Sequence, residues 1–230
     1  MLETIERPQS LTELATERLR TAIVEGAFAM GQPLSENMLS RMLSISKTPI
    51  KQALTELRNE GLLVIVPQKG TYVFTITPED LHLLSVVREA LETTALRCAW
   101  DNDGPKLVAA LSGLYTRMLE ARDRDDLIAY LRLDAVFHQT MLEMAANDYL
   151  MKAYRLIASK TRAVLFHLAD RPLQKRSFED HGTLIGLLRD DKLAEAEALL
   201  RVHVHRHSHI DFSRIQEFGA HNYSLPSGLK

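Results

Sequence analysis

Apolar residues recur every three or four positions in three separate stretches near the start of the chain, a spacing that predicts three short helices. The first stretch spans residues 11–25, the second follows Ser35, and the third follows Ser46. Serine is a preferred residue for capping a helix N-terminus. Pro49 falls in the first turn of the third helix, where its missing N–H breaks no helical hydrogen bond.

The pattern then changes to two strand-like runs, residues 62–66 and 71–75, on either side of the polar turn 67–70. Such runs around a turn that contains glycine predict a two-stranded hairpin. Helices followed by a hairpin make the order of a winged helix-turn-helix, whose recognition helix enters the major groove of DNA. We therefore predict a DNA-binding domain over residues 1–76.

The third helix buries an apolar stripe and turns a polar face outward, with Lys47 and Lys51 on it. On this helix Gln52 could read adenine, while the two lysines could reach guanine or a phosphate. An ordinary solvated helix face is the alternative interpretation, and the hairpin that follows favours DNA. The predicted DNA-contacting residues are Asn37, Ser46, Lys47, Thr48, Lys51, Gln52, Lys69 and Gly70.

Composition and charge narrow the class of protein. The chain has 230 residues, enough for two modest domains, and a net charge of −2. Residues 1–76 hold eight basic and eight acidic side chains, so the DNA prediction depends on where the charges lie. The longest apolar run, 62–66, is too short to cross a bilayer, and the start of the chain lacks a signal-peptide pattern. Cys98 is the only cysteine, which excludes an intramolecular disulfide, and we expect a cytoplasmic protein.

The first domain resembles the GntR family of bacterial transcription regulators over residues 11–75. The matching positions are Leu34, Glu36, Leu39, Ser46, Pro49, Ala53, Leu54, Leu57, Glu60, Gly61, Leu62 and Gly70. The resemblance implies a homodimer on a palindromic operator. This sequence has Lys47 and Lys51 where the family has arginines, Gln52 for an acidic residue and Ser44 for a turn glycine, so details of operator preference are expected to differ.

After a joint at Ile76-Thr77-Pro78, only helical patterns follow. They run over residues 79–101, 105–121, 124–146, 148–170, 175–190 and 191–215. Helices with short connections predict an all-α antiparallel bundle over residues 79–218. The fold class is thus mainly α, and the polar segment 219–230 is expected to be a disordered tail.

The bundle also carries candidate metal ligands. Asp134 and His138 are four residues apart and share one face of a helix. His181 follows, and then a histidine-rich segment containing His203, His205, His207 and His209. Imidazole with carboxylate suits zinc, nickel, cobalt or iron. The four late histidines alternate between two faces of a helix and cannot all bind one ion.

This half of the chain resembles the FCD ligand-binding domain of the FadR branch of GntR regulators. The resemblance implies Asp134, His138, His181 and His203 as metal ligands, with His207 the alternative for the last. The metal stays open among zinc, nickel and manganese-like ions, with zinc the first expectation. It also implies a small carboxylate effector beside the metal. Arg88, four residues before Glu92, could bind that carboxylate, or could form only a surface salt bridge with Glu92.

The sequence thus favours a metabolite-responsive transcription regulator, most often a repressor in the resembling family. The effector stays open among sugar acids, dicarboxylates, aromatic acids, amino acids and fatty-acyl derivatives, and a polar metal site favours the small acids. The alternative function is a metal-dependent enzyme that uses the Asp/His site. That alternative lacks an identifiable general base and leaves the DNA-binding module without a role.

Overall fold

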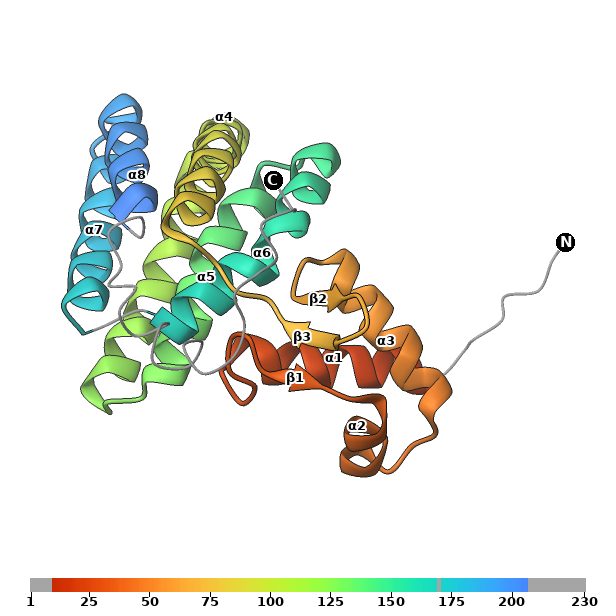
Figure 1. The fold of residues 1–230 in the computed structure, drawn as a ribbon. Coiled ribbons are helices and arrows are strands. Elements are labelled where there is room, and N and C mark those ends of the chain that lie inside the picture. The colour runs from red at the N-terminus through yellow and green to blue at the C-terminus, as the bar shows by residue number, and fades with distance from the viewer. Residues whose placement is uncertain (1–9, 169–170, 207–230) are drawn as a thin grey trace, which may run out of the picture. The chain divides into compact units, whose positions relative to one another are not determined.

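The computed structural model describes residues 10–168 and 171–206, and the chain divides into two compact units between Thr75 and Ile76 (Figure 1). The expected tail at 219–230, and the final part of the helix expected over 191–215, lie outside the described residues. No helix of the described part combines the length and the apolar character needed to cross a bilayer.

The first unit contains three helices, α1 (Leu11–Val24), α2 (Glu36–Leu43) and α3 (Lys47–Asn59). Ser10 and Glu13 form a capping box that starts α1, and the hydroxyl of Ser35 accepts a hydrogen bond from the Met38 N–H at the start of α2. Between α2 and α3, Ser44 adopts left-handed backbone angles, φ 55° and ψ 40°. The predicted order of helices and the short turn are therefore present.

The buried faces differ in part from the apolar pattern. Ile50, Ala53 and Leu57 of α3 are fully buried, as predicted. On α2 only Leu39 is fully buried, while Met42, which the helical spacing places on the same face, is 62% exposed. An eight-residue helix at the edge of a small domain has neighbours on only part of its circumference. The apolar spacing therefore predicts more buried residues on α2 than the structure has.

The sheet has three strands rather than the two predicted. Strands β2 (Leu63–Val66) and β3 (Gly70–Val73) form the hairpin, with Val66 opposite Gly70. The additional strand β1 (Pro33–Leu34) pairs antiparallel with β3, giving the order β1-β3-β2. Two residues show no alternation, and the proline is tolerated because β1 is an edge strand. No pattern in the sequence could have indicated this strand.

The second unit is a helical bundle. Its helices are α4 (Pro78–Asp123), α5 (Leu127–Met144), α6 (Asp148–Leu168), α7 (Arg171–Arg189) and α8 (Leu193–Arg206). Helix α4 packs against each of the other four, and α7 and α8 run side by side (Figure 1). The mainly helical fold class is confirmed.

The helices predicted over 79–101 and 105–121 form one helix, α4, and the break predicted between them is a kink. Asp103 has non-helical angles, φ −165° and ψ 80°, and its carboxylate accepts a hydrogen bond from the Lys106 N–H, so it caps the second half of α4. The Asn102 side chain donates to the carbonyls of Met144 and Ala145 at the end of α5. The kink is thus fixed to the adjacent helix end.

The bundle core is continuous and apolar along α4, α5, α7 and α8. Its fully buried large residues include Leu96, Leu107, Leu111, Met118, Phe137, Met141 and Leu188. Buried polar groups are concentrated at one place, where α4, α5, α7 and α8 each contribute an ionisable side chain. That place is the candidate site.

Candidate metal centre and nucleic-acid interface

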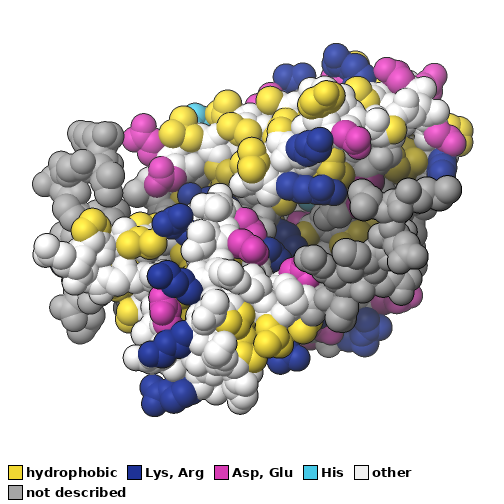
Figure 2. All heavy atoms as spheres, turned by 90° about the vertical axis from the view of Figure 1, so that its right-hand side faces the viewer, with side chains coloured by type: hydrophobic (Ala, Val, Ile, Leu, Met, Phe, Trp, Pro, Cys, Tyr) yellow, Lys and Arg dark blue, Asp and Glu magenta, His cyan; other side chains and the backbone are white. Residues whose placement is uncertain are grey.

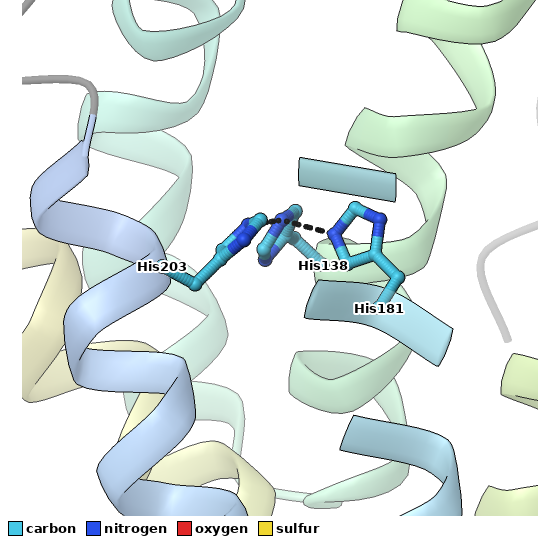
Figure 3. Close-up of side chains that lie close together, drawn as sticks. All are labelled: His138, His181 and His203. Carbon is cyan, nitrogen blue, oxygen red and sulfur yellow. Dashed lines mark hydrogen bonds between the residues drawn. The ribbon is translucent and has the colours of Figure 1, made fainter. Parts of the chain in front are cut away.

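Three histidines from three helices converge inside the bundle (Figure 3). His138 lies on α5, His181 on α7 and His203 on α8, and none is more than 2% exposed. The Nε2 atom of His138 is 3.3 Å from Nε2 of His181 and 3.1 Å from Nε2 of His203. One nitrogen from each ring lies within 4.8 Å of the other two.

These separations fit a shared metal ion. Two nitrogens bound at about 2.1 Å to one tetrahedral or octahedral ion lie roughly 3.0–3.4 Å apart. In contrast, three neutral imidazoles that point their nitrogens at one another gain at most weak hydrogen bonds. The donor set and its geometry therefore suit a divalent transition metal.

Asp134 lies one helical turn before His138 on α5 and is also buried. Its Oδ1 is 3.8 Å from Nε2 of His181 and accepts a hydrogen bond of 3.3 Å from the Ser177 hydroxyl. The structure thus brings Asp134 beside the three histidines, although the tight group contains the histidines alone. His207, the alternative last ligand, lies outside the described residues.

Two carboxylates hold the histidine rings from behind. The Nδ1–H of His138 donates to Glu92 at 2.7 Å, and Nδ1 of His203 is 3.3 Å from Asp180. A histidine that donates from Nδ1 presents the lone pair of Nε2 to a metal, and such carboxylate partners orient ligands and raise their basicity. The sequence gives no sign of this role for Glu92 or Asp180, because both are ordinary acidic residues on helices.

Burial and neighbouring charges together set the protonation states of Glu92 and His203. Burial opposes the ionisation of Glu92, but the Arg88 guanidinium and His138 outweigh it and lower the pKa of this carboxyl to about 2. Burial lowers the pKa of His203 below its usual value, and the nearby Asp180 offsets this only partly. Glu92 is therefore anionic and His203 neutral, the form that binds metals.

Arg88 is not part of a surface salt bridge. Its Nε donates to Glu92 at 2.5 Å, and both side chains are almost completely buried. Burial opposes the charge on Arg88, while Glu92 favours it, and the net result is a raised pKa. Arg88 therefore keeps its charge within the bundle, next to the histidine cluster.

Beside His138 and Arg88 lies a small cavity of about 10 Å³, which holds about one water molecule. We refer to it as the α6 cavity, because α6 supplies half of its wall. It is lined by Arg88, Leu131, Asp134, Ala135, His138, Tyr154, Thr161, Arg162, Leu165 and Phe166. Sequence reasoning missed Tyr154, Thr161 and Arg162, since nothing in the pattern of α6 distinguishes them.

The predicted DNA-contacting residues are all exposed on the first unit. This holds for Asn37, Ser46, Lys47, Thr48, Lys51, Gln52, Lys69 and Gly70. A row of lysine and arginine side chains is visible on the face shown in Figure 2. The hydroxyl of Ser46 forms no capping hydrogen bond with the first turn of α3, unlike Ser35 at α2. The start of α3 thus leaves N–H groups available to an anion such as a phosphate.

Gln52 is restricted in a way the sequence did not show. Its Oε1 accepts a hydrogen bond of 2.7 Å from the Thr12 hydroxyl on α1. The side-chain NH₂ group is then the part that remains for a base. Bidentate pairing with adenine uses both the oxygen and the nitrogen of the amide, so this geometry favours a base acceptor instead.

Comparisons with known proteins agree with both units. The model of the gntR family of bacterial regulatory proteins matches residues 11–73, and the FCD domain model matches residues 83–206. The chain is 29% identical over 182 residues to the Nta operon transcriptional regulator of Aminobacter aminovorans, an alignment covering 78% of this chain and 84% of that protein. It is 32% identical over 127 residues to the transcriptional repressor RspR of Escherichia coli K12, covering 55% and 56% of the two chains.

A solved structure of a GntR transcriptional regulator from Rhodococcus sp. RHA1 has the same fold. The TM-score is 0.76 at 19% sequence identity, over 93% of this chain and 100% of that one. A winged helix-turn-helix joined to a helical bundle with a buried histidine cluster defines a DNA-binding transcription regulator, and not an enzyme. The chain belongs to the GntR family and, through its FCD domain, to the FadR subfamily.

Proposed function

We propose that this protein is a repressor that binds a palindromic operator as a homodimer and is released by a small carboxylate. The observation that carries the proposal is the buried cluster of His138, His181 and His203 beside Arg88 and the α6 cavity. A five- or six-coordinate metal held by Asp134 and the three histidines would keep one or two positions for an anionic oxygen. Zinc is the first candidate for the metal and nickel the second.

The operator contacts would come from α3 and the hairpin. Lys47, Thr48, Lys51 and Gln52 are exposed on the first two turns of α3, the part of a recognition helix that reaches base edges. Ser46 and Asn37 would contact the phosphate backbone, and Lys69 and Gly70 at the turn of the hairpin would contact the adjacent groove or phosphates. A symmetric operator would follow from the two-fold symmetry of a dimer.

The effector would bind between α4, α5 and α6, with its carboxylate near Arg88. Binding there would shift how the bundle holds the DNA-binding unit, a coupling of typically about 1–3 kcal/mol between two sites. Release of a repressor is the direction we propose, in keeping with the relative whose name describes a transcriptional repressor. A chromosomal operator would place the protein in the cytoplasm.

The test is fluorescence anisotropy of the full-length protein on DNA from upstream of its own gene. A scrambled duplex is the control, and both are measured at two salt concentrations. We expect tighter binding to the native fragment, with an affinity that falls steeply as salt rises. Small carboxylates are then added, with and without a chelator, and we expect release only in the metal-loaded protein. Equal and weak binding to both duplexes would contradict the operator assignment.

A further inference from the structure

The α6 cavity contains a second polar cluster that the metal centre does not use. The Thr161 side chain is only 7% exposed, and its hydroxyl has no hydrogen-bond partner within residues 10–168 and 171–206. The buried Nε of Arg162 likewise lacks a partner in the described part of the chain. Both side chains line the cavity that His138, Asp134 and Arg88 also line.

Buried donors without partners are uncommon, and each lowers stability unless something binds it. The two arginines differ in this respect. The charge of Arg88 is balanced by Glu92 at 2.5 Å. The buried Nε of Arg162 has no hydrogen-bond partner among the described residues, and no comparable carboxylate stands beside it there. Arg162 is half-buried, and its buried Nε is the cationic donor of this cavity that an anion could satisfy.

The cavity therefore has two polar sides. The α5 side carries Asp134 and His138, and the α6 side carries Tyr154, Thr161 and Arg162. The rest of the wall, with Leu131, Leu165 and Phe166, is apolar and suits a short carbon chain. One anionic group would meet the metal side, and a second would form charge-assisted hydrogen bonds with Arg162 and Thr161.

We propose that Arg162 and Thr161 are the second anchoring point of the effector, and that the effector is a short dicarboxylate. This inference rests on the proposed carboxylate-sensing function. The cavity holds about one water as it stands, so a four-carbon diacid must displace the side chains of Leu165 and Phe166. These residues lie in the last turns of α6, which makes this end of the helix the part that responds to the effector.

Isothermal titration calorimetry on the metal-loaded, full-length protein tests the inference. The probes are succinate and monomethyl succinate, which differ in one negative charge at nearly constant length. We expect the wild type to bind succinate about 10- to 100-fold more tightly than the monoester. In Arg162→Gln the two affinities should become equal, and Thr161→Val should reduce the preference in the same direction.

Arg155→Gln is the matched control, because Arg155 is an exposed arginine on the same helix. It should keep the wild-type preference for succinate. Metal content, measured by mass spectrometry, should be the same in all variants, and so should operator affinity in the absence of acids. Arg162→Lys should restore part of the preference, since it keeps the charge but not the planar fork.

The outcomes separate the two proposals. If the wild type binds both acids equally, or if Arg162→Gln keeps the preference, the second anchor is refuted while carboxylate sensing at the metal side stands. If neither acid binds although the operator does, the inference and the proposed effector class both fail, and only the assignment as a DNA-binding regulator remains. A preference that disappears in Arg155→Gln as well would show a general effect of charge rather than an anchoring residue.

Discussion

The Glu92 carboxylate links Arg88 to a candidate metal ligand, His138, inside the bundle. It accepts hydrogen bonds from Arg88 and from the Nδ1–H of His138, and it is fully buried. Removing one partner of a buried ion pair leaves the other charge without compensation. The same carboxylate fixes the orientation of a candidate metal ligand, so stability and metal affinity should depend on it together.

Glu92→Gln is therefore expected to reduce the free energy of unfolding by about 3–5 kcal/mol. It should also weaken metal affinity by about 10- to 100-fold, because the amide is a weaker partner for the His138 ring. Urea unfolding and competition with a chromophoric chelator measure the two effects. Glu120→Gln, on the exposed face of α4, is the control and should change neither quantity appreciably. An unchanged unfolding midpoint in Glu92→Gln would contradict the buried ion pair.

Gln52 and Lys69 should affect operator binding in different ways. Gln52 offers its NH₂ group, so Gln52→Ala should relax discrimination at a single base pair by about 1–3 kcal/mol. Lys69, exposed at the turn of the hairpin, should contact a phosphate. Lys69→Ala is then expected to weaken binding to every sequence alike and to lower the salt slope by about 1. Anisotropy with a set of single-base operator variants distinguishes the two patterns, and identical profiles for both variants would refute the assigned roles.

At the scale of elements, the turn between α2 and α3 stores strain. Ser44 has a left-handed conformation that is unfavourable for a residue with a Cβ atom. The turn must be tight, because it sets the angle between the two helices of the DNA-binding motif. A glycine would adopt the same angles without the steric conflict.

Ser44→Gly is expected to stabilise the protein by about 1 kcal/mol, the relieved strain less the greater entropy lost by glycine on folding. Thermal unfolding followed by circular dichroism measures the change. Ser40→Gly, inside α2, is a control of opposite sign, because glycine weakens a helix and the hydrogen bond from Ser40 to the Ile45 carbonyl is lost. A destabilised Ser44→Gly would show that the serine side chain supports the turn.

At the scale of the whole molecule, the question is whether the metal senses an effector or only ties the helices together. A substitution of His181 on α7 can distinguish the two roles. His181 belongs to the histidine cluster beside His138 and is not part of the DNA-binding unit. His181→Ala should lose metal and lose the response to carboxylates. It should still bind the operator if sensing is the main role of the metal.

Melting curves together with operator anisotropy decide this point. We expect a folded His181→Ala protein whose operator complex no longer responds to carboxylates. A large fall in melting temperature, with no carboxylate response in the wild type to lose, would favour a purely structural metal. The matched control is His82→Ala, an exposed histidine at the start of α4, which should behave as the wild type.

The spacing of apolar residues and the identity of cap and turn residues were enough to predict much of the secondary structure. Helical spacing, caps and turn residues placed the three short helices, the hairpin and the break at residues 101–104. They did so because each depends on residues within a few positions of one another. The shared face of Asp134 and His138 follows from the same rule, and so does the exposed polar face of α3.

Contacts between residues that are distant in the sequence depend on how the helices pack, so the local pattern could not predict them. The resemblance to the FCD domain pointed to His203, but spacing alone left His203 and His207 equivalent, since they share a helix face. The burial of Arg88 and the hydrogen bond from Thr12 to Gln52 required the folded chain. So did the carboxylates behind the histidines and the Thr161 and Arg162 side chains in the α6 cavity.

The physical reason is that local order and tertiary contact have different origins. The sequence by itself determined which residues share a helix face, because backbone geometry is the same in every helix. It did not determine which faces meet, since His138 and His203 lie 65 positions apart and approach only when α5 and α8 pack in one bundle. The tertiary structure therefore decided which of the polar residues form the site.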